Sequence, residues 1–136
     1  MPPALTAPQR APGGRSVTPA EAAAMLRAAF NLFDRWQLSD VQSRVLLGQP
    51  SAATYARWKQ GRVGAVPGDT VWRLGDLMGI HKALRYMFTD PARGYAWVHR
   101  PNQAFGGRSA LDRMLAGAPN DLSAVRAYLD AERAGW

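Results

Sequence analysis

Residues 39–61, SDVQSRVLLGQPSAATYARWKQG, decide the fold, because they predict two short helices separated by a tight turn. Ser39 and Gln42 have the spacing of a capping box, in which each side chain bonds the other residue's backbone N–H. The Gly-Gln-Pro segment at residues 48–50 stops this helix, and Ser51 caps the next one. Two short helices joined by a tight turn that contains glycine are typical of a helix-turn-helix.

A longer helix is predicted before this motif. The segment Thr18-Pro19-Ala20-Glu21 combines an N-cap threonine, a proline at the first helical position and a glutamate that closes a capping box. Apolar residues then recur at three- and four-residue steps, which is the pattern of a helix face packed on a core. These residues are Ala22, Met25, Leu26, Ala29, Phe30 and Phe33.

Two more helices are expected after the motif. The first starts at Asp69 or Thr70, and Gly79 is expected to break it. The second is expected over residues 80–88. The residues of the first that are expected to face inward are Val71, Trp72, Leu74, Leu77 and Met78.

The C-terminal third is predicted to hold three further helices. One runs over residues 91–97, after an Asp-Pro pair that disfavours helix at residue 90. A loop over residues 101–108 leads to a helix that Ser109 caps. The last helix starts near residue 120 and has one apolar face, made of Leu122, Val125, Tyr128 and Leu129. No segment alternates as a half-buried strand does, so the predicted fold class is all-α.

The composition is that of a small globular protein with excess positive charge. The chain has 136 residues, of which 47% are hydrophobic, and its net charge of +7 is spread along the sequence. Such a charge fits nucleic acid, an acidic protein partner or neither. The absence of cysteine excludes disulfides and suits a cytoplasmic protein. No apolar run is long enough to span a membrane, and residues 1–17 are expected to form a disordered leader.

No set of side chains in the sequence has the pattern of a catalytic or metal site. His81 and His99 fall in different predicted modules and lack the spacing of zinc ligands on a helix. Gly106-Gly107 lacks the strand, the lysine and the third glycine of a phosphate-binding loop. The chain is therefore predicted to act by binding, without enzymatic activity, metal or cofactor.

The helix-turn-helix suggests a set of DNA-contacting residues. In a motif that reads DNA, the second helix enters the major groove and its outward residues meet bases and phosphates. Arg57 and Lys59 suit phosphates, whereas Trp58 is expected to anchor the helix in the core. Helical hairpins of this kind also occur without any DNA-binding role. The candidates are Arg44, Gln49, Ser51, Thr54, Tyr55, Arg57, Lys59 and Arg62.

The C-terminal third carries a more specific pattern. Trp97-Val98, Pro101-Asn102, the run Phe105–Asp112 with its Gly-Gly-Arg loop, and Leu115-Ala116-Gly117 precede the final helix. This combination resembles the toxin-binding domain of the Xre/MbcA/ParS antitoxin family. Residues 18–90 resemble the Xre-type helix-turn-helix that precedes that domain, so the resemblance covers nearly everything after the leader.

The resemblance implies an antitoxin that is not itself an enzyme. Members pair with toxins that carry a RES domain, which resembles ADP-ribosyltransferases and uses NAD. The antitoxin covers the active-site cleft of the toxin, and several members repress their own operon by binding operator DNA. Members form homodimers within heterotetramers or larger complexes. The expected domains are the leader at 1–17, a helix-turn-helix and dimerisation domain at 18–90, and a toxin-binding domain at 91–136.

Four C-terminal residues are the candidates for contact with the toxin. Arg108, Arg126 and Arg133 carry cations that suit a cleft built for the pyrophosphate of NAD. Trp136 is a flat aromatic side chain that suits a nucleotide-shaped slot. Arg108 has a local alternative, which is to brace its own loop through hydrogen bonds to carbonyls. For the whole chain the alternative is a stand-alone DNA-binding regulator whose C-terminal domain only dimerises.

Overall fold

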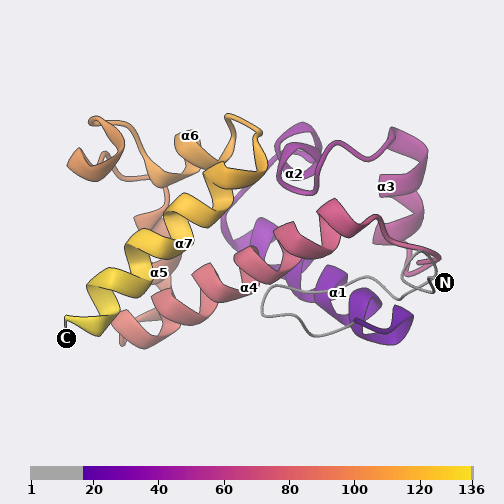
Figure 1. Cartoon of the computed structure of the whole chain (residues 1–136), viewed down its shortest axis with the longest axis horizontal. Helices are drawn as coiled ribbons and strands as arrows, with labels where there is room; N and C mark the ends of the chain where they lie inside the picture. The colour runs from indigo at the N-terminus through magenta and orange to yellow at the C-terminus, as the bar shows by residue number, and fades with distance from the viewer. Residues whose placement is uncertain (1–16, 136) are drawn as a thin grey trace, which may run out of the picture.

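A computed structural model describes residues 17–135, and within this range the protein is all-α (Figure 1), which confirms the predicted class. Residues 1–16 of the expected leader and Trp136 lie outside the described residues. Val17, which the sequence placed in the leader, is buried in the core. The α-helices are α1 (Pro19–Arg35), α2 (Asp40–Leu46), α3 (Ala52–Lys59), α4 (Gly68–Met87), α5 (Pro91–Trp97), α6 (Ala110–Met114) and α7 (Pro119–Ala134).

The helix starts predicted from the caps at Thr18, Ser39, Ser51 and Ser109 are confirmed, whereas α4 begins at Gly68, just before the predicted Asp69 or Thr70, and has no side-chain cap. Thr18 Oγ1 accepts a hydrogen bond from the Glu21 N–H at 3.1 Å, and the Glu21 carboxylate accepts one from the Thr18 N–H at 2.9 Å. Ser39 and Gln42 form the same reciprocal pair at the start of α2. Ser51 caps α3. The helix-turn-helix therefore has the boundaries that the capping residues predict.

Helix α4 is the central element of the fold. It packs against α1, α5 and α7, and α7 runs alongside it in the same direction (Figure 1). Its buried residues include Val71, Leu74, Leu77 and Ile80. The prediction that Trp72 faces inward is wrong: its side chain is 50% exposed, because it lies one position off the buried stripe.

The predicted break at Gly79 is also wrong, since α4 continues without interruption from Gly68 to Met87. A Cβ atom built on Gly79 would lie only 2.5 Å from Cζ of Arg126, which crosses α4 from α7. The Arg126 guanidinium donates to the carbonyl of Gly75 at 3.2 Å and to the carboxylate of Asp76 at 3.3 Å. Burial raises the pKa of Asp76, although Arg126 opposes this shift. The glycine therefore serves helix–helix contact rather than helix termination.

None of the helices within residues 17–135 is both long and apolar enough to cross a membrane.

The Gly79–Arg126 contact predicts an unusual pattern of stability. Gly79→Ala should lower the free energy of unfolding by about 1 kcal/mol, because the new methyl group displaces Arg126 from its partners. In an Arg126→Ala background the same substitution should instead raise it by up to ~1 kcal/mol, since alanine is the better helix former. Urea unfolding followed by circular dichroism measures both values.

Gly68→Ala is the matched control, because a Cβ atom at this position of α4 meets no atom within 4 Å. It should be neutral or slightly stabilising in either background. If Gly79→Ala destabilised the protein equally with and without the Arg126 side chain, Arg126 would not be the obstacle.

Candidate functional site

The loop before α6 holds a tightly organised pair of glycines. Gly106 and Gly107 both have left-handed backbone angles, with φ of 68° and 84°. The carbonyl of Asn102 accepts hydrogen bonds from the N–H groups of Phe105 and Gly107, both at 3.0 Å. The N–H of Asn102 donates in turn to the carbonyl of Arg108 at 2.9 Å. One residue therefore fixes both ends of the loop, and glycine permits the left-handed path between them.

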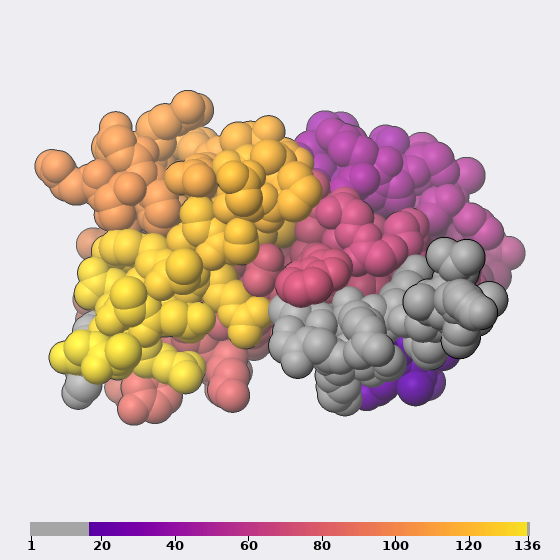
Figure 2. Space-filling model, viewed as in Figure 1, coloured from indigo at the N-terminus to yellow at the C-terminus, as the bar shows by residue number. Residues whose placement is uncertain are grey.

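Arg108 stands at the end of this loop with its side chain exposed to solvent. Its guanidinium makes no hydrogen bond, ion pair or aromatic contact with the part of the chain that the structure describes. The local alternative, in which Arg108 braces its loop through carbonyls, is therefore wrong. The loop and its neighbours lie at one corner of the molecule (Figure 2, orange). Arg108 is a cation on a rigid support that is free to meet a partner.

An aromatic cluster made of Trp97, Phe105 and Tyr128 connects this loop to α5 and α7. The Trp97 and Tyr128 rings are stacked with centroids 6.2 Å apart, and the Phe105 ring meets Tyr128 edge-on at 5.4 Å. All three side chains are only partly buried, and burial raises the pKa of Tyr128. Aromatic residues and arginine are both enriched at protein interfaces, and this loop region carries both types. The sequence shows these three aromatic residues, but it does not predict that their rings meet, because they come from three separate segments of the chain.

The other toxin-contact candidates differ in position. Arg126 lies in the contact between α4 and α7 and has partners inside the chain, so its placement favours a structural role. Arg133 lies with its guanidinium 5.0 Å from the ring centroid of Tyr86. Tyr86 is 69% exposed, and it was not predicted as a contact residue. Trp136 lies outside the described residues. Arg108 and Arg133 thus lie on the surface of the C-terminal region, and Arg126 lies largely within it.

A buried carboxylate holds the start of α7 in place. Asp121 accepts a hydrogen bond from the Ala118 N–H at 2.9 Å and pairs with Nε of Arg113 at 2.9 Å. Asp121 is buried, whereas Asp112, which caps α6 in the same way, is exposed. The ion pair connects α6 to α7 and so determines how α7 leaves the loop region.

The second helix of the helix-turn-helix presents a polar face. Ser51, Arg57, Lys59 and Arg62 are exposed, and Trp58 is buried as predicted. The selection of Tyr55 as an outward residue is wrong, because its side chain is 6% exposed and its ring packs edge-on against Phe30. The Tyr55 hydroxyl donates a hydrogen bond to Asp40 at 2.9 Å. This bond satisfies the polar group of the buried Tyr55 side chain.

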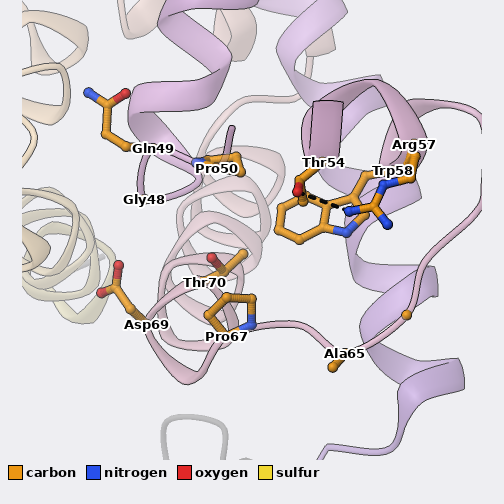
Figure 3. Close-up of a pocket in the computed structure, with 11 residues that line it drawn as sticks. Gly48, Gln49, Pro50, Thr54, Arg57, Trp58, Ala65, Pro67, Asp69 and Thr70 are labelled. Carbon is orange, nitrogen blue, oxygen red and sulfur yellow. Dashed lines mark hydrogen bonds between the residues drawn. The ribbon is translucent and has the colours of Figure 1, made fainter. Parts of the chain in front are cut away.

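The remaining candidates around α3 differ in orientation. Thr54 and Arg57 are joined by a 3.0 Å hydrogen bond and line an open cleft of about 410 Å³ (Figure 3). Gln49 has a left-handed backbone, with φ of 64°, and its side chain lies on the side of this cleft away from Arg57. Arg44 donates to the carbonyl of Pro50 at 3.0 Å and so braces the turn. Lys59 pairs with Asp40 at 3.5 Å. Arg57 is exposed and has no carboxylate partner among the described residues.

The two histidines occupy structural positions. His99 Nε2 lies 2.8 Å from the carbonyl of Trp36 and joins the end of α5 to the end of α1. His81 stacks on Tyr95, and burial together with Arg85 lowers its pKa. Within residues 17–135, no three His, Asp or Glu side chains gather closely enough to hold a metal ion.

The fold and these surfaces define a class: a two-part helical binding protein with a helix-turn-helix and a separate C-terminal interaction surface. Residues 15–81 match the model of the antitoxin Xre-like helix-turn-helix domain. Residues 83–135 match the antitoxin Xre/MbcA/ParS C-terminal toxin-binding domain. The chain belongs to the Xre/MbcA/ParS antitoxin family, and it is an antitoxin with a toxin-binding domain.

The chain is also similar to a relative over most of its length. The uncharacterized protein y4oB of Sinorhizobium fredii (strain NBRC 101917 / NGR234) is 47% identical over 112 residues, which cover 82% of this chain and 86% of the relative. No solved structure matches the chain.

The Asp121 contacts predict a local loss of stability. Asp121→Ala should lower the free energy of unfolding by about 2 kcal/mol, because it removes a helix cap and leaves Arg113 without its partner. Hydrogen exchange should increase in the first turn of α7. Asp112→Ala removes an exposed cap and should cost only about 0.5–1 kcal/mol. Equal losses for the two variants would contradict the role given to the Arg113–Asp121 pair.

Proposed function

We propose that this protein neutralises a RES-domain toxin by covering the toxin's active-site cleft with the loop at residues 101–108 and the adjoining face of α7. The observation that carries the proposal is the exposed Arg108 guanidinium, which has no partner among the described residues. Its backbone N–H donates at 3.2 Å to the carbonyl of Phe105, which belongs to the Trp97–Phe105–Tyr128 cluster. Binding to a second molecule would give this cation a counter-charge and would bury the aromatic edges.

The chemistry of the toxin class supports this assignment. A cleft that uses NAD must accept a pyrophosphate and therefore offers groups that bind anions and aromatic rings. An acidic cleft residue beside such groups suits Arg108, and the exposed Tyr86 with Arg133 extends the contact surface along α4 and α7. Trp136 follows α7 in the sequence and remains a candidate for the nucleotide slot. On this proposal residues 91–136, together with Tyr86 at the end of α4, carry toxin recognition, and the antitoxin blocks access of NAD without any reaction of its own.

A second activity, repression of its own operon, is supported by the helix-turn-helix. The exposed Arg57, beside Thr54, is placed to neutralise a phosphate, and Ser51 and Arg62 flank it at the two ends of α3. Operators read by such motifs are commonly two-fold symmetric, so this activity goes with a homodimer in a cytoplasmic heterotetramer or larger complex. Residues 18–90 are the part of the chain that we assign to DNA binding and dimerisation.

Co-expression separates the antitoxin from a stand-alone regulator. The protein encoded next to this one should arrest growth when expressed alone, and co-expression of the antitoxin should restore growth. Arg108→Glu should weaken binding to that protein by about 2 kcal/mol, or roughly thirtyfold, because it reverses the charge of the free cation. Isothermal titration calorimetry measures the affinity.

Arg27→Glu is the matched control, because Arg27 is also exposed but lies on α1. It should leave rescue and affinity unchanged. A neighbouring protein that is harmless alone would reject the antitoxin assignment, and full rescue by Arg108→Glu would reject Arg108 as a contact.

The DNA-binding surface is tested by Arg57→Ala combined with Lys59→Ala. The double variant should bind a duplex from upstream of its own gene more weakly, and the slope of log affinity against log salt should fall by about one for each phosphate that is no longer neutralised. Since Lys59 already pairs with Asp40, Arg57 should account for most of the effect. Mobility-shift titrations at several salt concentrations measure it. Lys82→Ala with Arg93→Ala, which changes two exposed cations away from α3, should leave the slope as it was.

A further inference from the structure

Arg73 is a buried cation whose partners come from both functional parts of the protein. Its side chain, on α4, is only 5% exposed. Nε donates to the carboxylate of Asp69 at 2.9 Å, one turn earlier on the same helix. Nη1 donates to the carbonyl of Val45 in α2 at 3.4 Å, and Nη2 donates to the carbonyl of Gly117 at 2.9 Å.

The two carbonyls mark two important turns. Val45 lies in the last turn of α2, directly before the turn of the helix-turn-helix, and Gly117 lies in the turn that leads into α7. These turns meet beside the start of α4 (Figure 1), and a Cβ atom built on Gly117 would lie 3.7 Å from Val45. A single guanidinium thus joins the DNA-binding motif to the helix that adjoins the toxin-binding loop.

The turn of the helix-turn-helix rests on the same group of atoms. A Cβ atom built on Gly48 would lie 2.6 Å from the Asp69 carboxylate and 3.2 Å from Nε of Arg73. Next to it, the buried hydroxyl of Thr70 donates to the carbonyl of Leu47 at 2.7 Å. The position of residues 47–48 is therefore set by Asp69, Thr70 and Arg73 together. A shift of Arg73 cannot leave this turn unchanged.

A buried guanidinium cannot easily lose any of its hydrogen-bond acceptors. Losing even one acceptor leaves a buried donor unpaired, which is strongly unfavourable. If the Gly117 turn moves when a partner binds α7 and its neighbouring loop, Arg73 must follow it or lose that bond. Either response changes the atoms on which the turn at residues 47–48 rests.

We propose that Arg73 is a positioning residue that couples toxin binding to operator binding. This inference rests on the proposed function, because it takes the C-terminal surface as the toxin site and α3 as the DNA site. Occupation of the first site biases the conformation of the second through the Asp69–Arg73 pair and its two carbonyl partners. The coupling is reciprocal, so operator DNA changes the affinity for toxin by the same factor.

The first test needs no toxin. Hydrogen exchange is measured on the free protein and on Asp69→Asn, which weakens the ion pair at a carboxylate that is 48% exposed. Exchange should increase together at the amides of residues 47–49 and of residues 116–118. The matched control is Asp130→Asn. The Asp130 side chain is 52% exposed, and it pairs with Arg126, four residues earlier on α7. Asp130→Asn should increase exchange at neither turn. An increase at only one turn in Asp69→Asn would overturn the coupling.

The second test measures the coupling itself. Anisotropy titrations give the affinity of the antitoxin for a labelled duplex from upstream of its gene, with and without saturating amounts of the neighbouring gene's product. The ratio of the two affinities should be about tenfold for the natural protein and for Asp130→Asn, within the usual range of allosteric coupling. It should fall to within about threefold of unity for Asp69→Asn and for Arg73→Lys. Using the ratio removes any direct effect of the lost Asp69 charge on DNA.

The outcomes are distinct. The coupling is overturned if the ratio of DNA affinities with and without the neighbouring protein is one in the natural protein. It is also overturned if Asp69→Asn leaves this ratio unchanged. Neither result contradicts toxin binding or DNA binding themselves. Failure of the neighbouring protein to bind at all rejects the proposed function, and the hydrogen-exchange test still decides whether the two turns are linked. If Arg73→Lys does not fold, Asp69→Asn carries the experiment, because it leaves the buried arginine in place.

Discussion

The burial of a single guanidinium is the constraint on which the arrangement of this protein depends. The buried Arg73 guanidinium is hydrogen-bonded by acceptors from α2, from α4 and from the turn before α7, and burial of a cation without such partners is strongly unfavourable. None of these segments can satisfy it alone, so the helix-turn-helix and the toxin-binding region must assemble around α4 together. The hydroxyl of Thr70 and the contact of Arg126 with Gly79 add two more connections along the same helix. The two regions are thus parts of one packed structure.

The sequence predicted those features that depend on bonds between near neighbours in the chain. Caps at Thr18, Ser39, Ser51 and Ser109 each involve a residue three positions away, so they are visible in any short window. The boundaries of most helices, the turn of the helix-turn-helix and the all-α class follow from them. The buried position of Trp58 and the apolar face of α7 follow from helical periodicity in the same way.

Features that depend on distant residues could not be predicted from the sequence. Gly79 has the local character of a helix breaker, and its real function is visible only once Arg126 is placed above it. Tyr55 has a polar group suited to a surface, but Asp40 satisfies that group in the interior. The candidate toxin-binding surface also combines features that the sequence predicts with features that depend on distant residues. The loop with Arg108 was found from its glycines, whereas the Trp97–Phe105–Tyr128 cluster requires three separate elements to meet.

The continuity of α4 bears on how such proteins can diversify. The boundary between the two sequence modules falls at residues 81–83, inside α4, which runs unbroken from Gly68 to Met87. Recombination at that boundary would join half-helices whose packing against α1 and α7 was selected separately. Such a junction would place new residues on the helix against which both regions of the protein pack.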